Sequence, residues 1–273
     1  MGACVCENPP QHADRDSRDD SGASICQSEE GKVEIGASDP YLPHLHPATM
    51  MNIPLAISTQ QMNDTLPGIN GRHLRLSQPV LAGIYTGKIR MWNAPQIQAL
   101  NPRSEPPDAR DQVRAIPGWP KLALGIAAAG NSGMMTTVKD NSYSVTYIGG
   151  SHERETMADH PGQAMLKNRT GRFRLPNVAT IESAAVARVG KIPKNETLSL
   201  VFAPGPNGYP IINYEHAIVS KTFSPAAGAV RTQTFLTWAL TQRHAPWAGA
   251  FPAPRLSCRT HEQSSNCRDS MSA

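Results

Sequence analysis

Hydrophobic positions along the chain fall into short segments that are separated by turns rich in Gly and Pro. Val33 and Ile35 alternate with polar residues ahead of Gly36, which predicts a short strand. A longer alternation over 143–150 ends in two glycines and predicts another strand. The apolar runs 51–58, interrupted by Pro54, and 209–219, with Pro210 near its start, predict buried strands.

Helical spacing of apolar residues appears between these strands. A helix over 78–84 is predicted from Val80, Leu81 and Ile84 on one face, and Asn93 is expected to cap a second helix that has Pro95 in its first turn. Further predicted elements are short strands at 74–76 and 198–202, a helix opened by the turn 130–133, a helix capped by Thr180 and ended by Gly190, and a helix over 230–242 whose core-facing residues are Phe235, Leu236, Ala239 and Leu240. Residues 151–176 are expected to be irregular apart from one helical turn. Alternation of strands and helices indicates an α/β fold.

Candidate ligand residues lie where the first predicted strand ends, in the segment Gly36-Ala37-Ser38-Asp39-Pro40. Ser38 or Asp39 is suited to cap a helix, and Pro40 fits its first turn. Ligands of open α/β sheets bind at such strand ends, and helix N-termini favour anions. A plain capping role for Asp39 remains the alternative reading of this motif.

Length and composition narrow the class of protein. The chain has 273 residues, 39% of them hydrophobic, with 24 Pro and 21 Gly, which suits two loop-rich domains. The net charge of +4 is not concentrated in a stripe, so nucleic-acid binding is not expected. No apolar run is long enough to span a membrane.

The sequence offers no motif for a metal, a cofactor or catalysis. Cysteines occur only near the termini, and their odd number leaves at least one thiol unpaired: Cys4, Cys6, Cys26, Cys258 and Cys267. His44 and His46 share the spacing of a metal pair but lack a clear third ligand, so loop histidines are the favoured interpretation. No nucleophile elbow, Walker loop or Cys/His pair is present, so no enzyme activity is predicted.

Three segments resemble the phosphate-binding proteins of bacterial ABC importers, mycobacterial and other actinobacterial versions above all. They are the Gly-Ala-Ser-Asp segment within 33–42, the Gly-Lys-Ile-x-x-Trp-Asn-x-Pro-x-Ile-x-x-Leu-Asn-Pro segment within 85–102, and the Gly-Tyr-Pro-Ile-Ile-Asn-Tyr-Glu segment at 208–215. The resemblance implies an α/β, two-domain, periplasmic-binding-protein-like (type 2) fold in truncated form. It places domain I at 31–57 and 210–252 and domain II at 58–209, with disordered segments at 1–30 and 253–273.

The same resemblance implies a binding role without catalysis or cofactor. Asp39 would accept a hydrogen bond from protonated phosphate and repel sulfate, and Ser38 would be a second ligand. The expected partners are inorganic phosphate and the permease subunits of an ABC importer, with the protein itself a monomer. Relatives of this kind work outside the cytoplasm, anchored to the cell membrane as lipoproteins. The N-terminal 32 residues contain no apolar core of a signal peptide.

The chain departs from the family pattern in places that matter for binding. An Arg-Ser-Asp-Gly-Ser-Gly loop that would hold phosphate is missing, and the pattern is interrupted near 115–128, where Arg114 is a weak substitute cation. Two N-terminal turns that supply ligands are also not recognised, although Ser21-Gly22-Ala23-Ser24 has a suitable composition. A frameshifted or internally deleted gene would explain these breaks. The alternative function is therefore a non-binding remnant of the family, and a phosphate ester hydrolase is a weaker third.

Overall fold

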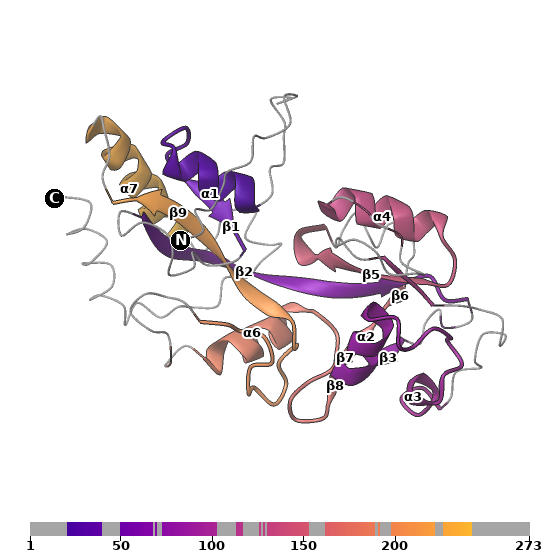
Figure 1. Ribbon diagram of the computed structural model, residues 1–273. Coiled ribbons are helices and arrows are strands. Elements are labelled where there is room, and N and C mark those ends of the chain that lie inside the picture. Colours follow the sequence, from indigo (N-terminus) through magenta and orange to yellow (C-terminus); the bar gives the residue numbers. More distant parts are fainter. Residues whose placement is uncertain are drawn as a thin grey trace, which may run out of the picture. The chain divides into compact units, whose positions relative to one another are not determined.

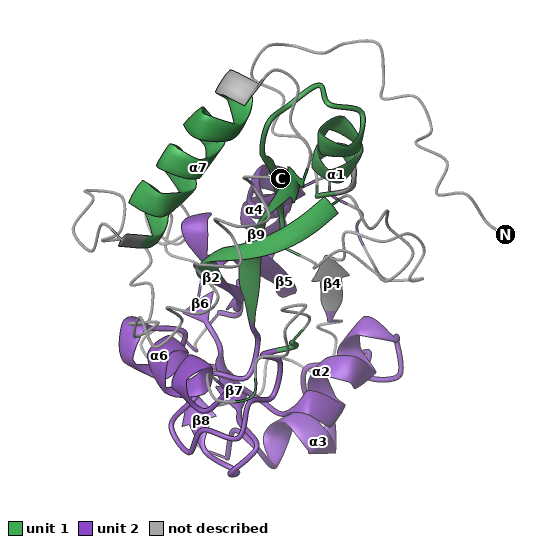
Figure 2. Cartoon of the chain, turned by 90° about the vertical axis from the view of Figure 1, so that its left-hand side faces the viewer, with its two compact units in different colours: residues 1–57, 189–199, 213–273 green, residues 58–188, 200–212 purple. Residues whose placement is uncertain are grey.

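We describe the protein from a computed structural model (Figure 1). The described residues are 21–39, 50–67, 69, 73–102, 113–116, 126, 128, 130–152, 162–188, 191, 198–221 and 226–241. The chain divides into two compact units, coloured separately in Figure 2. Unit 1 comprises 1–57, 189–199 and 213–273, and unit 2 comprises 58–188 and 200–212.

Helices and short strands alternate along the chain. The helices are α1 (Ser21–Glu29), α2 (Gln78–Tyr85), α3 (Pro95–Gln98), α4 (Gly130–Asp140), the 3-10 turn η1 (Gly150–His152), α6 (Val178–Val186) and α7 (Ala226–Thr241). The strands are β1 (Gly36–Ser38), β2 (Met50–Asp64), β3 (Arg75–Leu76), β4 (Arg114–Ile116), β5 (Ser144–Gly149), β6 (Gly162–Gln163), β7 (Met165–Lys167), β8 (Phe173–Arg174) and β9 (Ile212–Ser220). This mixed α/β content confirms the predicted fold class.

Two sheets organise these strands. The larger sheet has the hydrogen-bonded order β1-β9-β2-β5-β4, with β6 pairing with β2. The smaller one has the order β3-β7-β8. The long strands β2 and β9 contribute to both units, because the unit boundaries fall after Ile57 and after Ile212. Both strands therefore carry the chain between its units.

Unit 1 is built on β9, which pairs antiparallel with β1 and is packed on two sides. On one side, Ile25 of α1 and Met50 of β2 form a buried cluster with Ile218. Elsewhere in the unit, Leu236 of α7 packs with Ala217 and with other aliphatic residues of β9 and β2. Since successive side chains of a strand point to opposite faces, α1 and α7 cover opposite faces of β9.

Unit 2 has the larger described core. Trp92 is 1% exposed, and its indole N–H donates to the carbonyl of Tyr143 at 3.0 Å. The Tyr209 ring is fully buried, and its hydroxyl donates to the carbonyl of Gln60 at 3.0 Å. A further cluster joins α4 to β5 through Met134, Val138 and Ile148. Thus the Trp-containing segment that marks the family resemblance has a structural role, as expected.

Several strand predictions need correction. Residues 33–35 are not a strand; β1 starts at Gly36 because the N–H groups of Lys32 and Val33 bond to the Gln27 carbonyl at the end of α1. Residues 198–202 form a turn closed by a bond from the Ala203 N–H to the Leu200 carbonyl. The segment 151–176, expected to be irregular, contains β6, β7 and β8.

Helix boundaries also differ from the predictions. α3 is capped by Ala94 and not by Asn93, since the Ala94 carbonyl accepts the first helical N–H groups. α6 begins at Val178 with Asn177 as its cap, and Thr180 completes the capping box from inside the helix. In α7, Leu236 is buried as predicted, but Phe235 and Leu240 are about half exposed (47% and 46%).

Candidate functional site

The carboxyl end of β1, where Ser38 and Asp39 were predicted as ligands, lies beside the first turn of α1. The N–H of Asp39 donates to the Ser21 hydroxyl at 3.2 Å, and the N–H of Ala37 donates to the Ser24 hydroxyl at 2.9 Å. Further along, the Ser28 hydroxyl donates to the Ile218 carbonyl at 2.9 Å. These bonds fix α1 antiparallel to β1, with its first residue next to Asp39; α1 lies beside β1 in Figure 1.

The helix α1 overturns part of the expectation for the N-terminal segment. Residues 1–30 were predicted to be disordered, yet 21–29 form a helix whose first turn is the Ser21-Gly22-Ala23-Ser24 stretch. Three serines at helical spacing explain the position of α1, because Ser21, Ser24 and Ser28 all face β1 or β9 and make hydrogen bonds to the backbone of these strands or of the residue that follows β1. The Ser/Gly composition was the signal for this turn in the sequence, but we did not rely on it because no strand pattern precedes it in the sequence.

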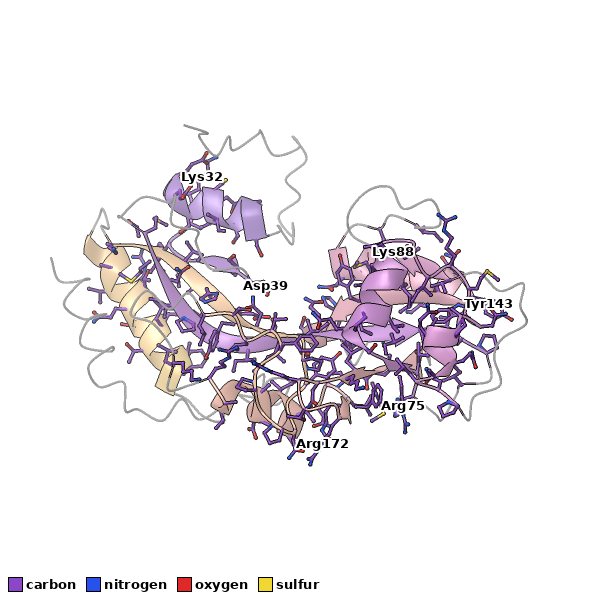
Figure 3. All side chains as sticks on the ribbon, turned by 60° about the horizontal axis from the view of Figure 1, so that its bottom comes forward. Lys32, Asp39, Arg75, Lys88, Tyr143 and Arg172 are labelled. Carbon is purple, nitrogen blue, oxygen red and sulfur yellow. The ribbon has the colours of Figure 1, made fainter. Side chains whose placement is uncertain are left out.

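Ser38 and Asp39 differ in their exposure. The Ser38 side chain is 4% exposed, whereas Asp39 is exposed at the end of the strand (Figure 3). Asn213 of β9 donates from its amide to the Asp39 carbonyl, which ties this strand end to β9. The helix predicted to start at Pro40 lies outside the described residues. Within unit 1, the backbone of Asp39 is therefore held beside a helix N-terminus by bonds on two sides, and its carboxylate is exposed there.

His216 joins this strand end from a distant part of the sequence. In the antiparallel register of β1 and β9 it is the direct partner of Ser38, so both side chains occupy the same face of the sheet. The imidazole is 2% exposed, and neither ring nitrogen has a hydrogen-bond partner of normal geometry within the described part of the chain. Burial lowers the pKa of His216, and the nearby backbone of Asp39 and Ser38 opposes that shift only in part. No sequence pattern pointed to this residue.

A second buried polar cluster lies in unit 2, at the end of β2. Asp64 is 1% exposed; its Oδ1 accepts the Leu66 N–H at 3.3 Å, and its Oδ2 has no hydrogen-bond partner among the described residues. A Cβ at position 162 would lie 2.7 Å from Oδ1, so the Gly there lets β6 approach the carboxylate. Burial raises the pKa of Asp64 to about 6, against smaller lowering effects of the Leu66 N–H and of His73.

Arginine side chains that are exposed or half-buried gather at the small sheet of unit 2. The guanidinium groups of Arg172 and Arg174 both donate to the amide oxygen of Asn207, at 3.1 and 2.7 Å. Arg75 lies 5.5 Å from the ring centroid of Phe173 (Figure 3). Stacking and amide contacts of this kind order a surface hairpin and do not make an enclosed site. Arg114 belongs to β4, and most of the predicted deletion region 115–128 lies outside the described residues.

Other candidate chemistry finds no support in the described part of the chain. No group of three or more His, Cys, Asp or Glu side chains there is placed to hold a metal ion. His44 and His46 lie outside the described residues. None of the described helices is long and apolar enough to cross a membrane. What the unit 1 site offers is one carboxylate, serine hydroxyls, a buried imidazole and the N–H groups of a helix N-terminus, a set suited to a protonated oxyanion.

Sequence comparisons confirm the predicted resemblance. The chain is 27% identical over 241 residues to the phosphate-binding protein PstS of Methanocaldococcus jannaschii, a match that covers 72% of this chain and 61% of that protein. It is 26% identical over 255 residues to PstS3 of Mycobacterium bovis, covering 79% of this chain and 68% of the relative. The chain thus spans about three fifths of the first of these proteins. No family model matches the chain.

Comparison with solved structures bears on the fold. The structure of a high-affinity periplasmic phosphate-binding protein, PfluDING, solved with bound phosphate, superposes with a TM-score of 0.63 and 16% identity. The superposition covers 92% of this chain and 89% of that protein. The predicted periplasmic-binding-protein-like fold is therefore confirmed.

Proposed function

We propose that this protein binds inorganic phosphate, with Ser38 and Asp39 as ligands at the carboxyl end of β1. The observation that carries the proposal is the position of α1, whose first turn is bonded to Asp39 through Ser21. A helix N-terminus presents unpaired N–H groups and a partial positive charge to an anion. Serine hydroxyls on both elements add donors, which a buried oxyanion requires.

Asp39 provides the selectivity in this proposal. Its carboxylate accepts a hydrogen bond from a protonated phosphate oxygen. Sulfate at neutral pH has no proton to donate, so the same carboxylate faces it as an unpaired like charge. A binding protein with this arrangement takes phosphate and rejects sulfate of nearly the same size.

Support for a transport role comes from proteins similar to this chain, which are phosphate-binding proteins by name or, in one solved structure, an ABC-type phosphate transport receptor. We infer that this chain captures phosphate outside the cytoplasm and delivers it to the permease subunits of an ABC importer, without catalysis. The rival proposal is a remnant of the same ancestry that no longer binds. It rests on the missing Arg-Ser-Asp-Gly-Ser-Gly loop, since a phosphate ion beside Asp39 needs many donors or a cation.

Calorimetric titration of the purified full chain with phosphate, and with sulfate in parallel, tests the proposal. We expect heat with phosphate only, and a weaker affinity in Asp39→Asn by roughly tenfold or more, as for a hydrogen bond to a charged group. Asp140→Asn, at the exposed end of α4 in unit 2, is the matched control and should bind as the unchanged protein does. A folded protein that gives no heat with phosphate would establish the remnant.

A further inference from the structure

His216 is a buried imidazole whose ring nitrogens make no hydrogen bond of normal geometry among the described residues, although the backbone of Asp39 and Ser38 lies close to the ring. A buried imidazole without partners costs free energy, and native proteins keep such groups rarely. Its neighbour across the strands is Ser38, and the residue that follows β1 is Asp39; these are the two ligands proposed above. The imidazole and the serine hydroxyl lie on the face of the sheet that α1 covers.

The chemistry of a neutral imidazole fits a protonated phosphate. Because burial lowers the pKa of His216, the ring in the free protein has one N–H donor and one bare nitrogen acceptor. Phosphate near neutral pH presents both unprotonated oxygens, which accept, and a protonated oxygen, which donates. Sulfate presents acceptors only. The ring N–H can donate to an oxygen of either anion, and only the bare nitrogen could distinguish them, by accepting from the protonated oxygen of phosphate.

We infer that His216 is a further ligand of the anion site in unit 1, where its ring N–H donates to an oxygen of the bound phosphate. This inference rests on the proposed function. It assigns to β9 a direct part in binding, beyond its role of carrying the chain between the units. It also gives the buried ring a hydrogen bond of normal geometry, which it lacks among the described residues.

The substitution His216→Phe separates a ligand from a poorly satisfied core residue. Phe keeps the ring and its packing against Tyr214, whose centroid lies 6.1 Å away, and removes both nitrogens. Loss of unpartnered buried polar atoms should leave the free protein as stable or more stable in thermal unfolding. Phosphate affinity, measured by calorimetry, should fall roughly tenfold or more if the ring is a ligand.

Thr232→Val is the matched control. Thr232 lies in α7, is 1% exposed, and its hydroxyl also has no hydrogen-bond partner among the described residues. Since α7 packs with Ala217 and Val219, on the opposite face of β9 from His216, this control removes a similar polar group away from the site. We expect unchanged phosphate affinity in Thr232→Val.

The outcomes distinguish the two proposals. No phosphate binding by the unchanged protein overturns the proposed function. Binding that Asp39→Asn weakens but His216→Phe leaves intact overturns the inference on His216 alone. If His216→Phe does not fold, ring ¹⁵N chemical shifts of His216 in the unchanged protein decide: they should move on addition of phosphate and stay still with sulfate, and shifts unmoved by phosphate would contradict the inference.

Discussion

His216 in unit 1 and Asn168 in unit 2 are both buried polar side chains, but they differ in how many hydrogen bonds they make within the protein. Asn168 is 5% exposed, and its amide nitrogen donates to the carbonyls of Pro206 and Gly208, both at 3.1 Å. Its oxygen accepts from the Thr170 N–H and hydroxyl and from the Arg172 N–H. The imidazole of His216 has no such partner in the described chain.

This difference separates two uses of buried polarity. A side chain whose bonds are all made inside the protein holds loops together, and Asn168 joins the β7–β8 hairpin to the turn before β9. A buried polar side chain without hydrogen bonds either lowers the stability of the protein or makes its hydrogen bonds to a bound ligand. Asp64 stands between these cases, because one of its oxygens is bonded and the other is not.

The largest expected effect is at Asn168. Asn168→Ala removes five hydrogen bonds and leaves buried backbone groups unpaired, so we expect the free energy of unfolding to fall by about 3 kcal/mol or more. Urea unfolding measures it. Asn207→Ala, at an exposed residue that loses only its contacts to Arg172 and Arg174, should cost less than about 1 kcal/mol. Equal losses of unfolding free energy in the two variants would contradict the structural role assigned to the hydrogen bonds of Asn168.

A smaller effect of opposite sign is expected for Asp64→Asn. The folded protein holds the Asp64 proton more tightly than the unfolded chain does, since the pKa rises from 3.8 to about 6. Stability from this group is therefore present below about pH 4 and lost as the pH rises to about 6. The pKa difference between the folded and unfolded states corresponds to a total loss of stability of about 3 kcal/mol, since each pKa unit corresponds to about 1.36 kcal/mol.

Asn stays neutral, so Asp64→Asn should raise the free energy of unfolding at pH 7 by as much as that loss and leave it unchanged near pH 3.5. Urea unfolding at pH 3.5, 5 and 7 gives the profile for both proteins. A difference between them that does not grow with pH would show that Asp64 is not held in its acid form by burial.

The smallest effect is expected at the ion pair between Arg231 and Glu34 in unit 1. Both side chains are largely exposed (64% and 44%), and such pairs contribute between zero and about 1 kcal/mol. Arg231→Ala should therefore change neither the thermal midpoint appreciably nor the phosphate affinity. A large loss of phosphate affinity in this variant would show that removal of a polar group away from the site also weakens binding. A loss of affinity in His216→Phe would then no longer identify His216 as a ligand.

Local patterns in the sequence were sufficient for much of the fold. Clean alternation predicted β5, the spacing of Val80 and Ile84 predicted α2, and the apolar run at 51–58 predicted part of β2. The errors arose where a neighbour decided the outcome. β2 continues past the predicted 51–58 through Gln61 and Asn63, because β5 and β6 pair with it there.

By itself, the sequence determined the α/β class, the resemblance to phosphate-binding proteins, and Ser38 and Asp39 as candidate ligands, because each depends on residues close together in the chain. Only the tertiary structure brought Ser21 of α1 to Asp39 and His216 of β9 to Ser38. Strand register and helix docking set those contacts. They depend on hydrogen bonds between distant segments, which leave no periodic trace in the sequence of either one.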